Sequence, residues 1–474
     1  MREALQKIPG VNLVKKPELI FLSSLLFFII DNIVNYYTNL PVFVAFSIFI
    51  LPVIWLGLYL DGRKMIFLIS FSTVFIIATI IGNLIYPFHK SSVADLIFIL
   101  MFATAYFYYR NHKEVLKLWP SHIFLVVSII LFGFTIVGVN SMSLHTNEKE
   151  FKNLELIGIS FDSLVEQGHS VDEIKDKIPE NLDADSLIRS KLKAYFPNQP
   201  GIDTMQNLGV TMVPGIKIEK EELDKIEKKR HYNYGLFRVP HVPAYFFGFL
   251  LLLYIFLIYR KRKWIYLLPL MLISYLILLN GVRTFIVAAG LSVLIWFFVR
   301  RNIWFFVAFS VAGVFFIVFR YEIFEITKHT ILRPLSSLLV TVIDNPDRLS
   351  RVALFRSWIH ELQDFSWLDF LTGKNFYQSK MANLKNLFTP TWYHNDLLSI
   401  IFSYGLPAGF LFIFLFIKIY RDNRHIFNQN AFAFIFFLTI ILTSMFNGFY
   451  YYFPIFLMYI FWLIANQQPK TESA

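Results

Sequence analysis

The feature that most constrains the fold is a series of long apolar runs that recurs from residue 18 to residue 465. A helix of about 20 apolar residues crosses the ~30 Å hydrocarbon core of a bilayer. Within that core a helix satisfies every backbone N–H and C=O inside one segment, which irregular chain does not. We therefore expect an all-α polytopic membrane protein with about 12 transmembrane helices and two long extracytoplasmic loops.

Composition and charge agree with this class. Of the 474 residues, 56% are hydrophobic and only 16% are charged, whereas a soluble domain carries about 25% charged residues. The net charge of +11 does not indicate a nucleic-acid partner, because most Lys and Arg residues flank apolar runs in short loops, as in the positive-inside pattern. The chain has no cysteine, which excludes disulfides, thiolate metal sites and cysteine nucleophiles.

The basic residues also predict the topology. Clusters such as Arg260–Lys263 and Arg300–Arg301 assign their loops, and both termini, to the cytoplasmic side. The expected spans are residues 18–36, 42–60, 65–86, 93–109, 120–139, 243–259, 264–280, 284–299, 303–319, 396–419, 431–445 and 450–465. The expected regions are 1–139 with five spans, 140–240 as an extracytoplasmic insertion forming a small helical subdomain, 241–319 with four spans, 320–395 as an extracytoplasmic catalytic loop, 396–465 with three spans, and 466–474 as a cytoplasmic tail.

His394 stands where the second outer loop meets an apolar run, and Asn395 and Asp396 follow it. An imidazole has an ordinary pKa near 6.5, so it can accept a proton at neutral pH. A position at a helix N-terminus favours the neutral form that a base requires. A structural histidine that hydrogen-bonds within the loop is the alternative.

Arg283 lies at the expected outer turn between two apolar runs, where the positive-inside rule does not explain a cation. A guanidinium can hold a phosphate through two parallel hydrogen bonds. The alternative is an arginine whose charged end reaches the interface while its stem lies along apolar surface.

Two further arginines, Arg348 and Arg351, are three residues apart at the start of an amphipathic stretch, residues 350–362. They can share one helix face, whereas Arg356 points elsewhere on the helical wheel. Val352, Phe355, Ile359 and Leu362 form the apolar side of this stretch. A solvated helix start with salt bridges is the alternative. No HExxH motif, Walker loop or metal-spaced histidine cluster is present in the sequence, so we expect no metal and no cofactor.

Three stretches together resemble the superfamily of bacterial O-antigen ligases and polysaccharide polymerases of the Wzy type, which are membrane glycosyltransferases similar to the GT-C class. HNDLLSIIFSYGLPAGFLF resembles the family's His-Asn motif before a leucine-rich span, and LLNGVRTFIVAAGL resembles its Ser-Arg turn, with Val282 in place of serine. DRLSRVALFRSWIHELQDFSWLDFLTGKNF resembles its Arg-aromatic helix. YGLFRVPHVPAYFFGFL is a weaker match to a Gly-Phe–Pro-Asn motif, with His241 where asparagine is usual, and no role is carried over to His241.

The resemblance implies a metal-independent, inverting transfer of a glycan from undecaprenyl diphosphate to a sugar hydroxyl, on the outer face of the bacterial inner membrane. In this role His394 is the base, and Arg283 and Arg351 are further catalytic residues. Arg348, Asn395, Asp396 and Arg356 are the expected contacts to the diphosphate or glycan. The implied partners are the lipid-linked donor, a sugar acceptor, membrane lipid and a chain-length regulator, with no nucleic acid.

Several functions remain open at this point. A polymerase would extend a chain on the next lipid-linked repeat unit, whereas a ligase would attach the finished chain to a lipid A core or another terminal acceptor. We favour the polymerase, because the insertion at 140–240 can serve a chain-specific acceptor. A flippase or transporter of lipid-linked sugars belongs to another class and predicts charged residues at mid-membrane. A non-catalytic scaffold predicts that His394 tolerates substitution.

Overall fold

The computed structural model is helical throughout the residues it describes, which contain no strand. These residues are 42–60, 65–111, 241–262, 264–280, 282, 284–299, 303–327, 350–387 and 392–450, with scattered positions within 20–34, 125–133, 339–344 and 456–459. The helices are α4 (Val42–Leu60), α5 (Ile66–Ile85), α6 (Lys90–Asn111), α14 (His241–Lys261), η1 (Trp264–Tyr266), α15 (Leu267–Asn280), α16 (Thr284–Val299), α17 (Ile303–Val318), α18 (Arg320–Thr327), α20 (Ser350–Gln363), α21 (Trp367–Thr372), α22 (Phe376–Leu387), α23 (Asp396–Gln429) and α24 (Ala431–Phe446).

Four of these helices, α5, α6, α14 and α23, are long and apolar enough to cross a membrane. The pair α17–α18, which is bent by 72°, is a fifth candidate if it counts as one span. Shorter apolar helices are α4, η1–α15, α16 and α24. The chain is therefore a helical membrane protein. Several predicted spans coincide with helices, since α4 and α16 have the expected bounds. Which helices cross the membrane, and in which direction, stays a prediction.

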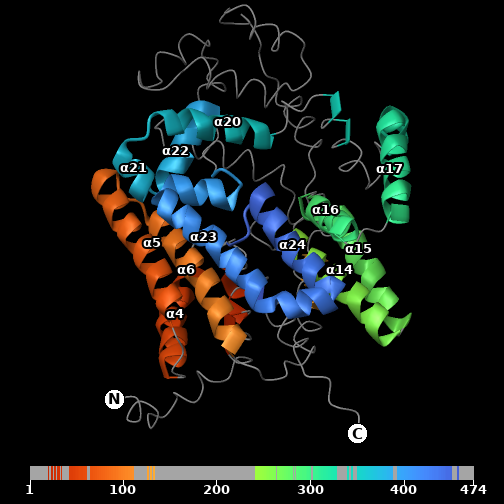
Figure 1. Cartoon of the computed structure of the whole chain (residues 1–474), viewed down its shortest axis with the longest axis horizontal. Coiled ribbons are helices and arrows are strands. Elements are labelled where there is room, and N and C mark those ends of the chain that lie inside the picture. The colour runs from red at the N-terminus through yellow and green to blue at the C-terminus, as the bar shows by residue number, and fades with distance from the viewer. Residues whose placement is uncertain are drawn as a thin grey trace, which may run out of the picture.

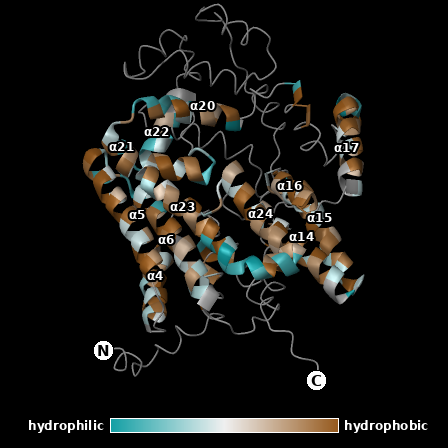
Figure 2. Cartoon of the chain, viewed as in Figure 1, coloured by the Kyte–Doolittle hydropathy of each residue, from teal (hydrophilic) through white to brown (hydrophobic). Residues whose placement is uncertain are grey.

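The described helices form a bundle that carries a layer of shorter helices at one end (Figure 1). We call this layer, α20–α22, the platform. It lies across the ends of α5, α6 and α23, while α17 stands at the edge of the molecule. The bundle helices are mostly hydrophobic along their length, except that the C-terminal end of α23 is hydrophilic (Figure 2). The predicted catalytic loop thus contains a helical layer rather than irregular chain.

Aromatic side chains fill the bundle core. Phe102 on α6 is fully buried and its ring lies 4.1 Å from that of Phe456 and 6.0 Å from that of Phe449. On α14, Tyr245 and Phe249 are buried and lie within 6.4 Å and 5.2 Å, centroid to centroid, of Phe285 on α16. Offset and edge-to-face ring pairs of this kind add specific geometry to the burial of apolar area.

The expected span 396–419 differs from the structure, because α23 is broken near its start and continues to Gln429. Gly405 has φ +83° inside α23, and Pro407 follows two residues later. A residue with φ in this range favours glycine, and proline lacks the N–H that a continuous helix requires. The first nine residues of α23, Asp396–Tyr404, are therefore set at an angle to the rest.

The break in α23 is also where the platform contacts the bundle. A Cβ on Gly405 would collide with the backbone of Leu371 on α21, and a Cβ on Gly373 would collide with the backbone at Ser403. The Lys374 N–H donates to the Phe402 carbonyl oxygen at 2.8 Å. Two glycines thus allow backbone to lie directly against backbone, which no pair of larger residues would permit.

Polar contacts anchor the platform to α5. Tyr86 donates from its hydroxyl to Asp369 Oδ1 at 2.6 Å, and the other carboxylate oxygen of Asp369 accepts from the hydroxyl of Ser366 in a capping box. Burial and the Asp369 carboxylate both raise the pKa of the Tyr86 hydroxyl. On α20 the buried residues are Leu354, Ser357 and Glu361.

The apolar stripe that was predicted for residues 350–362 is therefore not the face of α20 that packs on the bundle. Phe355 and Ile359, which belong to that stripe, are exposed. The helix was predicted correctly, but its buried face was not.

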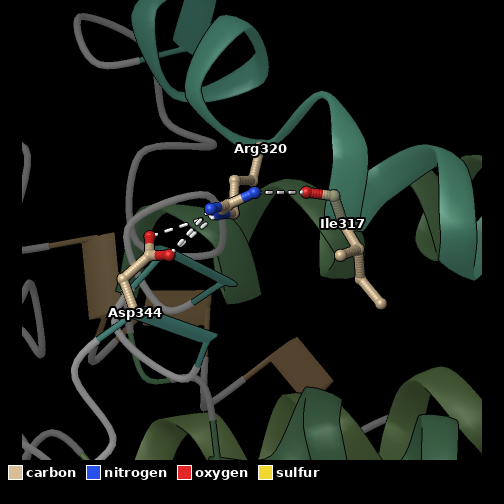
Figure 3. A network of polar contacts seen from close by, with 3 residues as sticks. All are labelled: Ile317, Arg320 and Asp344. Carbon is tan, nitrogen blue, oxygen red and sulfur yellow. Dashed lines mark hydrogen bonds and ion pairs between the residues drawn. The ribbon is translucent and has the colours of Figure 1, made fainter.

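The bend between α17 and α18 is held by Arg320, the first residue of α18. Its Nε and Nη2 donate to the carboxylate of Asp344 at 2.8–3.1 Å, and its Nη1 donates to the Ile317 carbonyl oxygen at 2.8 Å (Figure 3). Ile317 belongs to the last turn of α17, so this side chain connects both sides of the bend.

Some expectations concern residues that lie outside the described ranges. These are the insertion at 140–240, most of the first, fifth and twelfth expected spans, and the tail at 466–474. Their predicted structure is neither supported nor opposed.

Candidate functional site

Four segments that are distant in sequence meet beside the platform. They are the start of α14, the start of α20, the residues before α23 and the turn that follows α24. His241, Arg351, His394 and Asn447 are the polar side chains that they bring together. The prediction that His394 and Arg351 belong to neighbouring segments agrees with this arrangement, whereas Asn447 and His241 were not predicted to take part.

Arg351 is held by two uncharged oxygens. Its Nε donates to the Phe446 carbonyl oxygen and its Nη2 donates to Asn447 Oδ1, both at 2.7 Å. Asn447 in turn donates from Nδ2 to the hydroxyl of Tyr245 on α14 at 2.8 Å. These hydrogen bonds fix the direction of the guanidinium relative to the turn after α24.

The residues Met445–Tyr450, which we call the α24 turn, hold these acceptors in place. Asp396 at the start of α23 is fully buried, and its Oδ2 accepts from the Ser444 hydroxyl at 2.7 Å and from the Phe449 N–H at 2.6 Å. Gly448 has φ +81°, and a Cβ there would collide with the ring of Trp392 and approach the Asp396 carboxylate. The turn therefore requires glycine at this position.

A second buried carboxylate, that of Asp95, binds the end of the α24 turn through Tyr450. Tyr450 donates from its hydroxyl to Asp95 Oδ1 at 2.7 Å, and Tyr404 donates to Asp95 Oδ2 at 2.5 Å. Asp95 lies near the start of α6 and is 1% exposed. A carboxylate among apolar helices is costly unless it is hydrogen-bonded, so these two hydroxyls account for its presence and connect the turn to α6 and α23.

His394 lies close to two other rings at the end of the bundle. Its ring centroid is 5.0 Å from that of Trp392 and 6.4 Å from that of His241. The residue has φ +52°, a backbone conformation that is uncommon outside glycine and that clusters at functional sites. This strained position directly precedes the Asn395 cap of α23.

Burial holds the pKa of the His394 imidazole well below its ordinary value, and the positive charge of Arg351 and the ring of His241 act in the same direction. Hydrogen bonds with Asn447 act in the opposite direction. The ring is therefore neutral at pH 7, which is the form that can accept a proton. The sequence had suggested the helix dipole as the reason for neutrality, whereas burial is the larger cause.

Two residues that were predicted to contact substrate serve as structural supports. Asn395 caps α23, because its Oδ1 accepts from the Leu398 N–H at 3.0 Å while its Nδ2 donates to the Met445 carbonyl oxygen at 2.8 Å. Asp396 is fully buried, and its carboxylate holds the α24 turn. Both residues therefore help to shape the site, and their contacts to substrate stay predictions.

The described residues of this group of side chains do not include the other three predicted arginines. Arg356 is exposed on α20, five residues beyond Arg351. Arg283 and Arg348 lie outside the described residues, so their roles stay predictions. The described residue Phe285, two positions after Arg283, has its ring 6.4 Å from that of Tyr245.

Sequence reasoning missed His241, Tyr245 and Asn447. His241 carries the same signal that drew attention to His394, since each is an imidazole at the start of a long apolar helix. Asn447-Gly448 at the end of an apolar run is typical of a turn, but nothing in that pattern shows which side chain the asparagine meets. Tyr245 lies within an apolar run and carries no signal of its own.

The assembled site has two layers. His241, Arg351, Trp392, His394 and Asn395 are partly exposed, whereas Tyr245, Asp396 and Asn447 are fully buried beneath them. Among the described residues no group of three or more His, Asp or Glu residues could hold a metal ion. The arrangement provides a neutral base beside a fixed cation, which suits proton abstraction next to an anionic group. No family model matches this chain, and neither a curated protein nor a solved structure matches it.

Proposed function

We propose that this chain is a membrane glycosyltransferase that moves a glycan from an undecaprenyl-diphosphate donor to a sugar hydroxyl on the outer face of the membrane. The observation that carries the proposal is the juxtaposition of a neutral His394 with the Arg351 guanidinium, which the α24 turn orients through Phe446 and Asn447. A glycosyl transfer from a diphosphate requires both groups, one for the nucleophile and one for the leaving group.

His394 serves as the general base. It takes the proton of the acceptor hydroxyl while that oxygen forms a bond to the anomeric carbon of the donor. The bond from the anomeric carbon to the diphosphate oxygen breaks, and its electron pair stays on the diphosphate. A single displacement of this kind inverts the anomeric configuration.

Arg351 stabilises the charge that develops on the diphosphate. A diphosphate is already a good leaving group, so no general acid is required. A guanidinium that is oriented before the reaction stabilises the transition state without a cost of reorganisation. Arg283 and Arg348 are proposed as further contacts to the same diphosphate, and Arg356 as a peripheral contact to the glycan. The reaction needs no metal in this scheme.

The position of the site suits a lipid-linked substrate. His241 begins α14 and Asp396 begins α23, and both helices are apolar enough to span a membrane. A site at the ends of such helices lets a polyprenyl chain remain in the bilayer while its diphosphate reaches Arg351. The hydrophilic part of the substrate would then lie on the platform side.

The rival class, a transporter of lipid-linked sugars, uses charged groups within the membrane as part of its transport path. Asp95 is the buried carboxylate of α6, and two tyrosine hydroxyls hold it in a structural network. The site residues instead gather at the platform end of the helices. This distribution favours the enzyme, and within the enzyme class we retain the polymerase over the ligase because of the long insertion at 140–240.

The test is transfer by the purified full-length protein in lipid nanodiscs, with the undecaprenyl-diphosphate-linked glycan of the source cells as donor. We expect His394→Ala to slow product formation by about 10²–10⁴-fold, the usual contribution of a general base. His360→Ala is the matched control, because His360 is an exposed histidine on the neighbouring α20. Normal transfer by His394→Ala, or the absence of transfer by the unaltered protein, would reject the proposal.

Glycans that accumulate in a deletion strain would separate the two enzymes. Single carrier-linked repeats indicate a polymerase, and long carrier-linked chains indicate a ligase. Normal surface glycan in that strain would count against both.

A further inference from the structure

His241 has no contact in the described structure that explains why a polar ring occupies this position. It is the first residue of α14 and it is partly exposed, yet its Nδ1 is enclosed and makes no hydrogen bond to any described residue. An enclosed polar atom without a partner costs free energy. A ligand or an ordered water must supply the missing contact when the protein works.

The surroundings of His241 consist of rings. The His394 ring lies 6.4 Å away, the Tyr245 ring lies 6.4 Å away on the buried side, and Trp392 lies 5.0 Å from His394, all measured between centroids. Trp392 is itself partly exposed, and its ring lies directly against Gly448. Partly exposed rings beside an imidazole suit a ligand that has both C–H faces and hydroxyl groups.

The site therefore combines groups of two kinds of chemistry. Arg351 lies on the side of the α24 turn and suits an anion. His241 and Trp392 are rings close to His394 that suit a neutral ligand, and the charge of Arg351 also acts on His241. His394 stands at the boundary, where a reacting hydroxyl would have to meet an anomeric carbon.

We propose that His241 and Trp392 form a sugar subsite, in which the His241 imidazole hydrogen-bonds a ring hydroxyl and the Trp392 indole stacks on a C–H face of the same sugar. An imidazole can donate from one nitrogen and accept at the other, as a hydroxyl can also do both. This subsite rests on the proposed function, because it identifies the sugar next to the reacting bond as the group that His241 recognises.

Two ligands test the subsite separately from the anion contact. One is the free oligosaccharide released from the lipid-linked donor by mild acid, and the other is undecaprenyl diphosphate without sugar. We expect His241→Ala, in the full chain in nanodiscs, to weaken oligosaccharide binding by about tenfold, as for the loss of a hydrogen bond of ordinary strength. Its affinity for undecaprenyl diphosphate should stay unchanged.

Arg351→Ala should show the reverse pattern, with weaker binding of undecaprenyl diphosphate and unchanged binding of the oligosaccharide. His241→Asn should recover part of the lost affinity, because an amide also donates and accepts. His360→Ala serves again as the control, and the midpoint of thermal unfolding reports whether each variant is folded.

The outcomes distinguish this subsite from the proposed function. Equal loss of both ligands in a folded His241→Ala protein would show a structural role and overturn the subsite. Unchanged oligosaccharide binding, or no binding by the unaltered protein, would overturn it as well while leaving transfer by His394 intact. If the unaltered protein binds both ligands as described but transfers no glycan, the proposed function fails and the sugar subsite stands.

Discussion

Arg320 and Arg351 stand at the starts of two helices in the same predicted loop, yet they are held in opposite ways. Arg320 is paired with the Asp344 carboxylate through three hydrogen bonds (Figure 3). That guanidinium lowers the pKa of the Asp344 carboxyl below its usual range. Arg351 meets a backbone carbonyl oxygen and an amide oxygen instead. Arg320 is paired with a carboxylate across a bend, whereas Arg351 is oriented by two neutral acceptors of the α24 turn.

The contrast is between an arginine in a surface ion pair and the arginine that we propose to contact the diphosphate. An ion pair at the surface, like that of Arg320, ties two segments together and is screened by solvent and salt. A guanidinium that is fixed by neutral acceptors keeps its attraction for a substrate anion. The surrounding protein therefore indicates the role of an arginine more clearly than the sequence around it does.

Replacement of Arg351 tests the contrast most severely. We expect Arg351→Ala to reduce glycan transfer by about 10²–10³-fold, as when one oriented donor to a developing anion is removed. Arg351→Lys should recover little of this loss, because a single ammonium cannot reproduce the paired geometry with Phe446 and Asn447. The initial rate of transfer in nanodiscs measures the effect. A rate above a tenth of normal in Arg351→Ala would remove this arginine from the mechanism.

Gly448→Ala tests whether the α24 turn positions Arg351. The added Cβ must take φ +81° and collide with Trp392, which should displace the acceptors of Arg351 and reduce transfer by roughly tenfold, in keeping with the sensitivity of catalysis to small misplacements. Gly290→Ala is the matched control, because nothing lies within 4 Å of a Cβ built on Gly290. Equal activity of the two variants would show that the turn has no positioning role.

The pH dependence of transfer reports the protonation of His394. A histidine with the ordinary pKa of about 6.5 would lose about threefold of its neutral form between pH 7 and pH 6. The pKa of His394 lies well below that value, so we expect transfer to change by less than about twofold over this interval. A fall of about threefold, absent in an assay of donor binding alone, would contradict the low pKa.

Acid should also destabilise the fold through this residue. Because the pKa of His394 is lower in the folded protein than in the unfolded chain, the unfolded chain binds the proton more readily below about pH 6.5. The stability that the neutral ring contributes is present above that pH and is lost as the pH falls towards the folded value. Unfolding midpoints of the unaltered protein and of His394→Gln, measured from pH 7 to pH 5, should converge.

Arg320→Ala is the smallest expected effect. Its loss removes the contact to Asp344 and to Ile317 but no residue of the site, so transfer should remain within about twofold of normal, as for most surface ion pairs. A large loss of activity in this variant would show that the bend between α17 and α18 is coupled to the site, and the distinction between the two arginines would fail.

Hydropathy and charge predicted the helices well, because apolar length is a local property of the sequence. The bounds of α4, α16 and α24 needed only the ends of apolar runs. The break in α23 could not be placed, because Gly405 and Pro407 are tolerated within membrane helices and the backbone contact with Leu371 joins residues from different segments.

The candidate site was predictable only in part. His394 and Arg351 stand out as polar residues at the starts of helices, but the α24 turn was expected to be a plain connection between two spans. Asn447 and Asp396 acquire their roles from hydrogen bonds that cross the bundle. A single sequence shows which groups are unusual and does not show which of them meet.

The glycine-to-glycine junction between the platform and α23 has a mechanical consequence. Gly373 of the platform lies against the backbone of α23, and Gly405 of α23 lies against the backbone of α21. At these two contacts no side chain separates the backbones, so a displacement of one segment is passed to the other. The first nine residues of α23, which begin two positions after His394, therefore move with any tilt of the platform. Under the proposed function, a glycan chain that pulls on the platform would shift His394 with it, and tension in the growing polymer would reach the reacting centre.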